Sequence, residues 1–278
     1  MAAGPAEHRA GNADARPRSH RAGRTGHRGI PLSAVITTGR DRRVDRWWLA
    51  GAAVATVVAL VLGVLAPPDA VQGGIQKLMY VHVPAAWSAY LCFLSVLIAN
   101  LWGLMRTGSG AGRLARAAAE AGVVLTALTL ATGSLWGSAT WGTWWIWDAR
   151  ITSTLAMGLV YVAYLCLDSL TSTSRGRRLT AMVGVVGFAS APLVHFSVIW
   201  WRTLHQPATV LAPSLSPPID GRMGAALAAA VLAASLVTSL IVRLRHERLL
   251  PPASSGRPTP QGPKPAPHRS DPVPTVSR

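Results

Sequence analysis

Four of the chain's 11 tryptophans lie within residues 141–147, in the segment WGTWWIWDARIT. Asp148 and Arg150 follow them directly. Indole rings offer flat apolar surface to a planar ligand, and a guanidinium can bind carboxylates through paired hydrogen bonds. A short segment that combines both groups indicates a binding surface for a flat ligand with acidic substituents.

Three of the eight histidines lie outside the terminal tails, and these are His82, His195 and His205. His82 stands in YVHVPAAW, two residues before Pro84, which suits the first position of a helix. His195 stands in APLVHFSVIWW, three residues after Pro192, which predicts a bend in the helix that carries it. Taken singly, each histidine is a hydrogen-bonded polar residue or an interface anchor. Two imidazoles at similar depth on different helices could instead hold one metal between them.

The composition shows which elements position these residues. Half of the chain is hydrophobic and only 14% is charged, yet the net charge is +16, which is typical of a membrane protein with its charges in loops and tails. Because the bilayer core offers no water to backbone groups, apolar runs of about 20 residues are predicted to be transmembrane helices. There are six such runs: Trp47–Ala66, Pro84–Leu104, Ala117–Trp136, Ile151–Leu170, Leu179–Trp200 and Met223–Val242. The predicted fold is an all-α membrane protein.

Basic residues in the connections predict the orientation of these helices. Alternate connections and both tails carry 23 Lys and Arg, against 4 in the remaining connections. Both termini are therefore predicted to be cytoplasmic, with the tryptophan-rich loop on the outer side. The predicted organisation is a basic disordered tail (1–46), a six-helix membrane domain (47–245) whose loop 136–150 joins helices three and four, and a Pro-rich disordered tail (246–278). The basic tail is expected to bind anionic lipid, and no nucleic-acid partner is predicted.

Acidic residues within the predicted spans are few. Glu120 and Asp168 fall near the cytoplasmic ends of the third and fourth helices, where interfacial placement explains them. No acidic residue falls at mid-membrane, which gives little support to a proton or cation pathway.

The tryptophans are distributed unevenly between the two membrane faces. Three are predicted on the inner side and eight on the outer side; the outer ones are Trp87, Trp136, Trp141, Trp144, Trp145, Trp147, Trp200 and Trp201. An aromatic belt places tryptophan at both interfaces and does not explain this asymmetry. If residues 141–148 were helical, Trp141, Trp144, Trp145 and Asp148 would share one face as an aromatic shelf.

A shelf of indoles with an imidazole on each side suits haem. The porphyrin is flat and apolar, its iron accepts axial histidine, and its propionates favour arginine. Arg150 is the candidate for propionate contact. Two alternatives stay open: an ion pair between Arg150 and Asp148, and a role for Asp148 as the N-cap of the fourth helix. The chain has no C-x-x-C-H motif, so it is not itself a c-type cytochrome.

The tryptophan segment resembles the WWD signature of the cytochrome c assembly family, which handles haem on the outer face of bacterial and organelle membranes. MYVHVPAAW and HFSVIWWRTLHQP resemble the family's two flanking histidine segments. The resemblance runs from about residue 45 to residue 245, and with six helices the chain is most similar to the haem-exporter branch, CcmC. Arg202, which stands where a smaller polar residue is expected, and the long tails depart from the family pattern.

The resemblance implies specific roles. His82 and His195 match the axial ligands of the haem iron. The haem-presenting loop corresponds to Trp136, Trp141, Gly142, Trp144, Trp145, Trp147, Asp148 and Arg150. Further residues expected on the haem side are Trp87, Trp200, Trp201, Arg202 and His205.

Proteins of this branch are not classical enzymes. The resemblance implies that haem b is held as a transported ligand at the outer face of the bacterial inner membrane and is passed to a haem chaperone, CcmE. The implied partners are the ABC transporter subunits CcmA and CcmB and a small subunit, CcmD. The chain contains no G-x-x-x-x-G-K-[ST] motif, in agreement with ATP being handled by a partner.

Three alternatives remain on sequence grounds. A haem lyase of the same superfamily would have more membrane helices, and a further histidine pair or a large outer domain. A bis-histidine electron-transfer cytochrome b would place its histidines on facing helices within the bundle and would leave the tryptophan loop without a purpose. A structural membrane subunit would bind no haem and would be colourless when purified.

Overall fold

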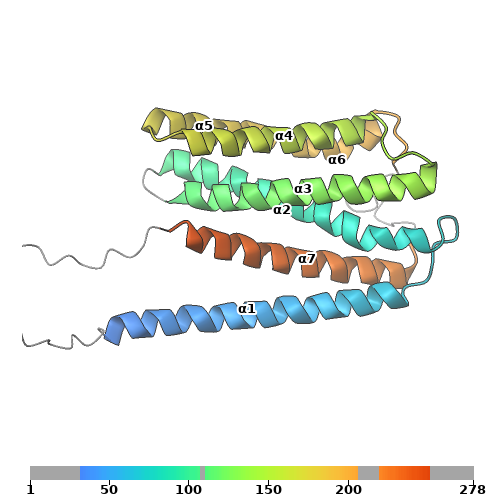
Figure 1. Cartoon of the computed structure of the whole chain (residues 1–278), viewed down its shortest axis with the longest axis horizontal. Coiled ribbons are helices and arrows are strands. Elements are labelled where there is room, and N and C mark those ends of the chain that lie inside the picture. The colour runs from blue at the N-terminus through green and yellow to red at the C-terminus, as the bar shows by residue number, and fades with distance from the viewer. Residues whose placement is uncertain (1–31, 107–109, 206–218, 251–278) are drawn as a thin grey trace, which may run out of the picture. The chain divides into compact units, whose positions relative to one another are not determined.

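The computed structural model describes residues 32–106, 110–205 and 219–250. Seven α-helices and one 3-10 helix make up these residues: α1 (Leu32–Leu65), η1 (Gly74–Leu78), α2 (Met79–Met105), α3 (Ala111–Trp141), α4 (Ala149–Leu170), α5 (Ser174–Gly187), α6 (Ser190–Trp200) and α7 (Gly221–Arg248) (Figure 1). The chain divides into two compact units after Arg43. The contacts described below all lie within the second unit, residues 44–278.

The prediction of six membrane-spanning helices is confirmed. By length and composition, six helical segments of the described residues can cross a membrane: Arg46–Leu65, Gly74–Met105, Ala111–Trp141, Ala149–Leu170, Ser174–Trp200 and Gly221–Arg248. Most are longer than their apolar cores, because polar turns at the ends continue the backbone hydrogen bonds of the helix. α1 begins within the predicted N-terminal tail. The predicted tails otherwise lie largely outside the described residues, up to residue 31 and from residue 251.

The second span begins earlier than the sequence predicted. Pro84 is not the first residue of α2 but lies inside it, because the 3-10 helix η1 leads directly into Met79. Proline lacks the N–H that would bond to the carbonyl of Tyr80, so one backbone hydrogen bond is missing at the sixth residue of α2. His82 therefore lies within the first turn of α2 rather than in the preceding loop.

The fifth span is interrupted close to where a bend was predicted. α5 ends at Gly187 and α6 begins at Ser190. Between them, the amides of Phe188 and Ala189 donate to the carbonyls of Val185 and Val186, three residues earlier. Pro192 cannot donate to the carbonyl four residues earlier, which is that of Phe188. That carbonyl instead accepts the amide of Ala191 at 3.0 Å. His195 is thus carried by a separate short helix.

α2 lies at the centre of the bundle and packs against α3, α5 and α7, while α4 packs against α3, α5 and α6 (Figure 1). The Phe93 ring of α2 stacks on Tyr161 of α4 with ring centroids 3.7 Å apart. A side chain at Gly122 of α3 would overlap Phe93 of α2, and this glycine therefore lets α2 and α3 approach closely. The bundle core is built from such close contacts between aromatic and small residues.

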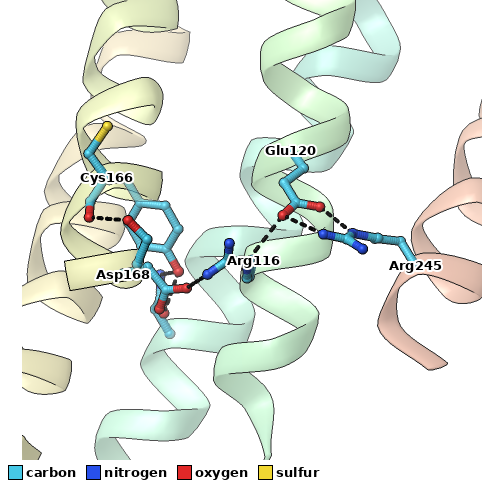
Figure 2. A network of polar contacts seen from close by, with 8 residues as sticks. Arg116, Glu120, Cys166, Asp168 and Arg245 are labelled. Atoms are coloured by element: carbon cyan, nitrogen blue, oxygen red, sulfur yellow. Dashed lines mark hydrogen bonds and ion pairs between the residues drawn. The ribbon is translucent and has the colours of Figure 1, made fainter. Parts of the chain in front are cut away.

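An ion-pair network joins three helices near the start of α3 (Figure 2). The Glu120 carboxylate accepts hydrogen bonds from Arg116 at 3.1 Å and from Arg245 of α7 at 2.6 Å. Arg116 also donates to Asp168 of α4 at 2.9 Å. The two acidic residues that the sequence placed near one end of their helices are thus each paired with arginine. Because these side chains are partly exposed, the network contributes more to the register of the helices than to stability.

Candidate functional site

A cavity of about 280 Å³ lies at the other end of α3 from this network, between α2, α3, α4, α6 and the loop before α4. Eight predicted site residues line it: His82, Trp87, Trp136, Trp141, Trp145, Arg150, His195 and His205. Seven do not: Gly142, Trp144, Trp147, Asp148, Trp200, Trp201 and Arg202. All three histidines that the sequence singled out therefore converge on one cavity.

The predicted helical shelf at residues 141–148 is wrong. α3 ends at Trp141, Gly142 caps it with a φ of 72°, and residues 143–148 are not helical. A left-handed backbone conformation is open to glycine and turns the chain away from the helix axis. The Thr143 carbonyl then comes within 3.4 Å of the position that a side chain at Gly137 would occupy, and the loop packs back on α3.

The loop conformation sorts the tryptophans into two groups. The cavity indoles, which line the cavity, are Trp87, Trp136, Trp141 and Trp145. The rim indoles, which lie on the surface, are Trp144, Trp147, Trp200 and Trp201, with exposed fractions of 63%, 72%, 57% and 50%. Trp144 and Trp145 are neighbours in the sequence and yet fall into different groups.

Asp148 is the N-cap of α4, one of the two alternatives left open by the sequence. One carboxylate oxygen accepts the amide of Ile151 at 2.8 Å. The other oxygen lies 3.3 Å from Nδ1 of His205. In the described residues the carboxylate is therefore shared between a helix cap and a histidine, and Arg150 is directed elsewhere.

The contact with Asp148 holds His205 in one orientation. His205 lies in the segment after α6, and its ring also makes an edge contact with Trp141, with ring centroids 5.3 Å apart. A carboxylate only accepts, so Nδ1 must carry a proton and Nε2 of the neutral ring keeps its lone pair. Burial keeps the pKa of His205 below its ordinary value, although Asp148 opposes this shift. A neutral imidazole with a carboxylate behind it is a common arrangement for a metal ligand.

His82 is held against α3. Its Nδ1 lies 3.1 Å from the hydroxyl oxygen of Thr132, and its ring meets Trp136 edge-on with centroids 5.8 Å apart. A Cβ at Gly133 would come within 2.9 Å of the His82 ring, so only glycine leaves room for it there. Thr132 and Gly133 were not singled out from the sequence.

His195 and Arg150 are joined through the backbone. The Arg150 guanidinium donates to the main-chain carbonyl of His195 at 3.3 Å. The Nε2 atom of His195 is buried and has no hydrogen-bond partner among the described residues, and the same holds for the indole N–H of Trp145. Both side chains line the cavity, so a bound ligand could satisfy these atoms.

The outer wall of the cavity is fixed by a residue that the sequence analysis missed. The Gln72 side-chain oxygen accepts the indole N–H of Trp136 at 2.8 Å. Gln72 is positioned by a turn in which the Asp69 carboxylate accepts the amides of Val71 and Gln72, and these bonds hold the pKa of Asp69 below its usual range. The D-x-x-Q spacing of an aspartate turn was the only available signal, and it did not reveal the long-range partner.

The chemistry of the cavity matches a planar metal-containing ligand. Indole rings can stack on such a ligand, imidazole nitrogens can reach its metal, and the Arg150 guanidinium can meet its carboxylates. The cavity volume of about 280 Å³ lies at the small end of the range for ligand sites.

Comparison with known proteins supports the same conclusion. Residues 35–252 match the family described as Heme exporter protein C. A Heme exporter protein C of Bradyrhizobium diazoefficiens is 41% identical over 170 residues, which cover 61% of this chain and 65% of the relative. That of Escherichia coli K12 is 38% identical over 181 residues, covering 62% and 72%. A putative ccmC-like cytochrome c biosynthesis protein of Arabidopsis thaliana mitochondria is 37% identical over 156 residues, covering 56% and 59%.

Proposed function

The chain belongs to the Heme exporter protein C family, and we propose on this basis that it is the membrane subunit that holds haem during cytochrome c maturation and delivers it to a haem chaperone. The observation that carries this proposal is the convergence of His82, His195 and His205 on one indole-lined cavity. Haem b is the ligand, held without covalent attachment, and the protein acts as a carrier rather than as an enzyme.

We assign the axial positions of the haem iron to His82 and His205. Both rings have Nδ1 engaged by a neighbouring side chain, and both line the same cavity. The sequence alone suggested a different pair, His82 with His195, and the unpartnered Nε2 of His195 supports that alternative. The carboxylate behind His205 favours the first pair, because such partners orient metal-bound histidines and strengthen the bond.

The cavity indoles hold the ring plane in this proposal, and Arg150 meets a propionate. Arg150 is already anchored to the His195 carbonyl, which keeps the guanidinium at the edge of the cavity. The indole N–H of Trp145 also lines the cavity, and it is a buried donor without a hydrogen-bond partner among the described residues. A porphyrin with its apolar edge inward would satisfy both donors with its propionates.

The rim indoles serve delivery. Two exposed tryptophans in the loop before α4 and two at the end of α6 offer apolar surface that a partner can cover. We propose that this partner is the haem chaperone CcmE, and that the transporter subunits CcmA and CcmB and the small subunit CcmD bind elsewhere on the protein. The cavity end faces the outer side of the bacterial inner membrane, and both termini face the cytoplasm, since the basic residues gather towards the other end.

Haem spectra of single histidine variants test the assignment. We expect the purified parent protein to show a six-coordinate spectrum, and His82→Ala and His205→Ala each to lose one ligand and to bind haem at least about 10-fold more weakly. Added imidazole should partly restore the parent spectrum. His246→Ala, at the far end of α7, is the matched control and should match the parent.

The outcomes separate the two pairings and the wider proposal. A spectral change in His195→Ala with none in His205→Ala would establish the pair that the sequence suggested. A parent protein that binds no haem would refute the function itself. Rapid redox cycling with a quinol would support the cytochrome b alternative instead.

Reporter fusions test the orientation. Fusions after residues 110 and 176 should report the cytoplasm, and fusions within 67–82, 137–149 and 203–220 should report the outer side. An outer signal at residue 176 would place the cavity in the cytoplasm and would contradict the proposal.

A further inference from the structure

The hydrogen bonds around Thr132 define how His82 is protonated. The Thr132 hydroxyl lies 2.7 Å from the Leu128 carbonyl and 3.3 Å from the Thr129 carbonyl, and both of these oxygens only accept. The single hydroxyl proton is therefore directed at the backbone, towards Leu128. The oxygen of Thr132 is left as an acceptor, 3.1 Å from Nδ1 of His82.

The proton on the ring follows from this. With Thr132 unable to donate, the contact at 3.1 Å is a hydrogen bond only if Nδ1 of His82 carries the proton. A neutral imidazole with a proton on Nδ1 has its lone pair on Nε2.

We propose that Thr132 is a positioning residue that selects the Nδ1–H tautomer of His82 and so presents Nε2 as a metal ligand. Gly133 and Trp136 confine the same ring from α3, so three residues within about one turn of one helix determine its tautomer, its approach and its tilt. This inference rests on the proposed haem site, but its first consequence concerns the protein without ligand. His82 is already prepared for the iron before haem arrives.

The tautomer of His82 in the haem-free protein tests the proposal directly. In nitrogen NMR spectra of protein labelled at histidine, the His82 signals are identified by their loss in His82→Gln. We expect the parent and Thr132→Ser to show one tautomer with Nδ1 protonated, and Thr132→Val to show a mixture. Thr56→Val is the matched control, because Thr56 makes the same hydroxyl bond to a carbonyl four residues earlier, on α1.

Haem affinity provides the second measurement. Thr132→Val should weaken haem binding about 10-fold, within the usual range for loss of a partner behind a metal-bound histidine. It should also raise the haem reduction potential, since a less basic imidazole stabilises ferric iron less. Thr132→Ser and Thr56→Val should keep the parent values.

Failure of this inference is distinguishable from failure of the proposed function. A single unchanged tautomer in Thr132→Val, together with parental affinity and potential, would refute the role of Thr132 while haem binding stood. Loss of the tautomer preference in Thr56→Val as well would show a general packing effect and would also overturn the inference. A parent protein without haem affinity would refute the function, and the NMR result would still decide the tautomer.

Discussion

The cavity indoles and the rim indoles are the same residue type in neighbouring segments, yet members of the two groups differ in their contacts and in their exposure. Trp136 is hydrogen-bonded to Gln72 and touches the His82 ring, and Trp141 touches His205. Trp144 and Trp147 are mostly exposed, and the only ring contact of Trp147 within the described chain is with Trp145. Trp136 and Trp141 are thus held by side chains distant in the sequence, whereas Trp144 and Trp147 are left open to a partner. The difference suggests that holding a ligand and handing it on are separable tasks of adjacent residues.

The largest effect is expected from removing a cavity indole. Trp136→Ala should lower the free energy of unfolding by about 2–3 kcal/mol, because it loses buried apolar area and a hydrogen bond. It should also weaken haem binding, since the His82 ring loses a wall. Thermal unfolding and haem titration in detergent measure the two effects.

Trp136→Phe provides the control for this variant. Phenylalanine keeps an aromatic wall and loses only the N–H bonded to Gln72, so about 1 kcal/mol of the effect should remain. If Trp136→Ala were no more harmful than Trp147→Ala, the division between cavity and rim indoles would be wrong.

A smaller effect is expected at Asp148, whose carboxylate caps α4 and contacts His205. Asp148→Ala should cost about 1–2 kcal/mol through the lost cap of α4, whereas Asp148→Asn keeps the cap and removes only the charge beside His205. Haem binding should therefore weaken in both variants, but stability should fall mainly in Asp148→Ala. Equal stability loss in the two variants would show that the charge, not the cap, is what the fold uses.

In the haem-free protein, the contact between Asp148 and His205 should also affect how thermal stability depends on pH. Because the folded-state pKa of His205 is lowered, the neutral ring favours the fold, and this contribution is complete above the ordinary histidine pKa of about 6.5. It is lost as the pH falls from there towards the folded-state pKa. Asp148→Asn removes the group that opposes the shift, so thermal stability should fall more steeply with acid in Asp148→Asn than in the parent.

Gly142 tests whether the turn itself matters. Gly142→Ala should cost about 1 kcal/mol, because alanine at a φ of 72° is strained while no atom crowds the position. The expected loss comes from the turn alone, so haem affinity should change little. A large loss of haem with little loss of stability would show that the turn determines how the cavity indoles are placed.

The rim indoles should have the smallest effect on the protein itself. Trp147→Ala and Trp144→Ala should change the free energy of unfolding by less than about 0.5 kcal/mol, as exposed substitutions do. They should retain haem but load the co-expressed chaperone poorly. The measurement is haem on the chaperone beside haem on this protein, with Val71→Ala as an exposed control in another loop. Full loading by the rim variants would leave these tryptophans as an ordinary interfacial belt.

Much of the fold could be predicted from the sequence. The six spans follow from hydropathy because a membrane helix must satisfy its own backbone, and the Asp148 cap follows from its position before an apolar run. The extra turns of α2 before Pro84 could not be predicted. They depend on η1, whose sequence has no helical periodicity of its own.

The site was predictable in its residue types but not in its contacts. The sequence predicted that His82 and His195 lie at similar depth, yet the acceptors beside His82 and His205 come from distant parts of the chain: Thr132 lies 50 residues from His82, and Asp148 lies 57 residues from His205. The helical shelf was expected from spacing, and a single glycine at residue 142 overrides it. Side-chain partners across helices depend on packing, which periodicity does not encode.

The ion-pair network of Figure 2 has a consequence for how salt acts on this protein. Arg116 and Arg245 are balanced by Glu120 and Asp168, so this meeting point of three helices is electrically neutral within a chain of net charge +16. The surplus charge therefore resides in the loops and terminal segments, where counterions can screen it over about 10 Å at 0.1 M salt. Ionic strength should therefore alter how tightly the protein binds to anionic surfaces. The stability of the helical bundle and its cavity should depend little on salt.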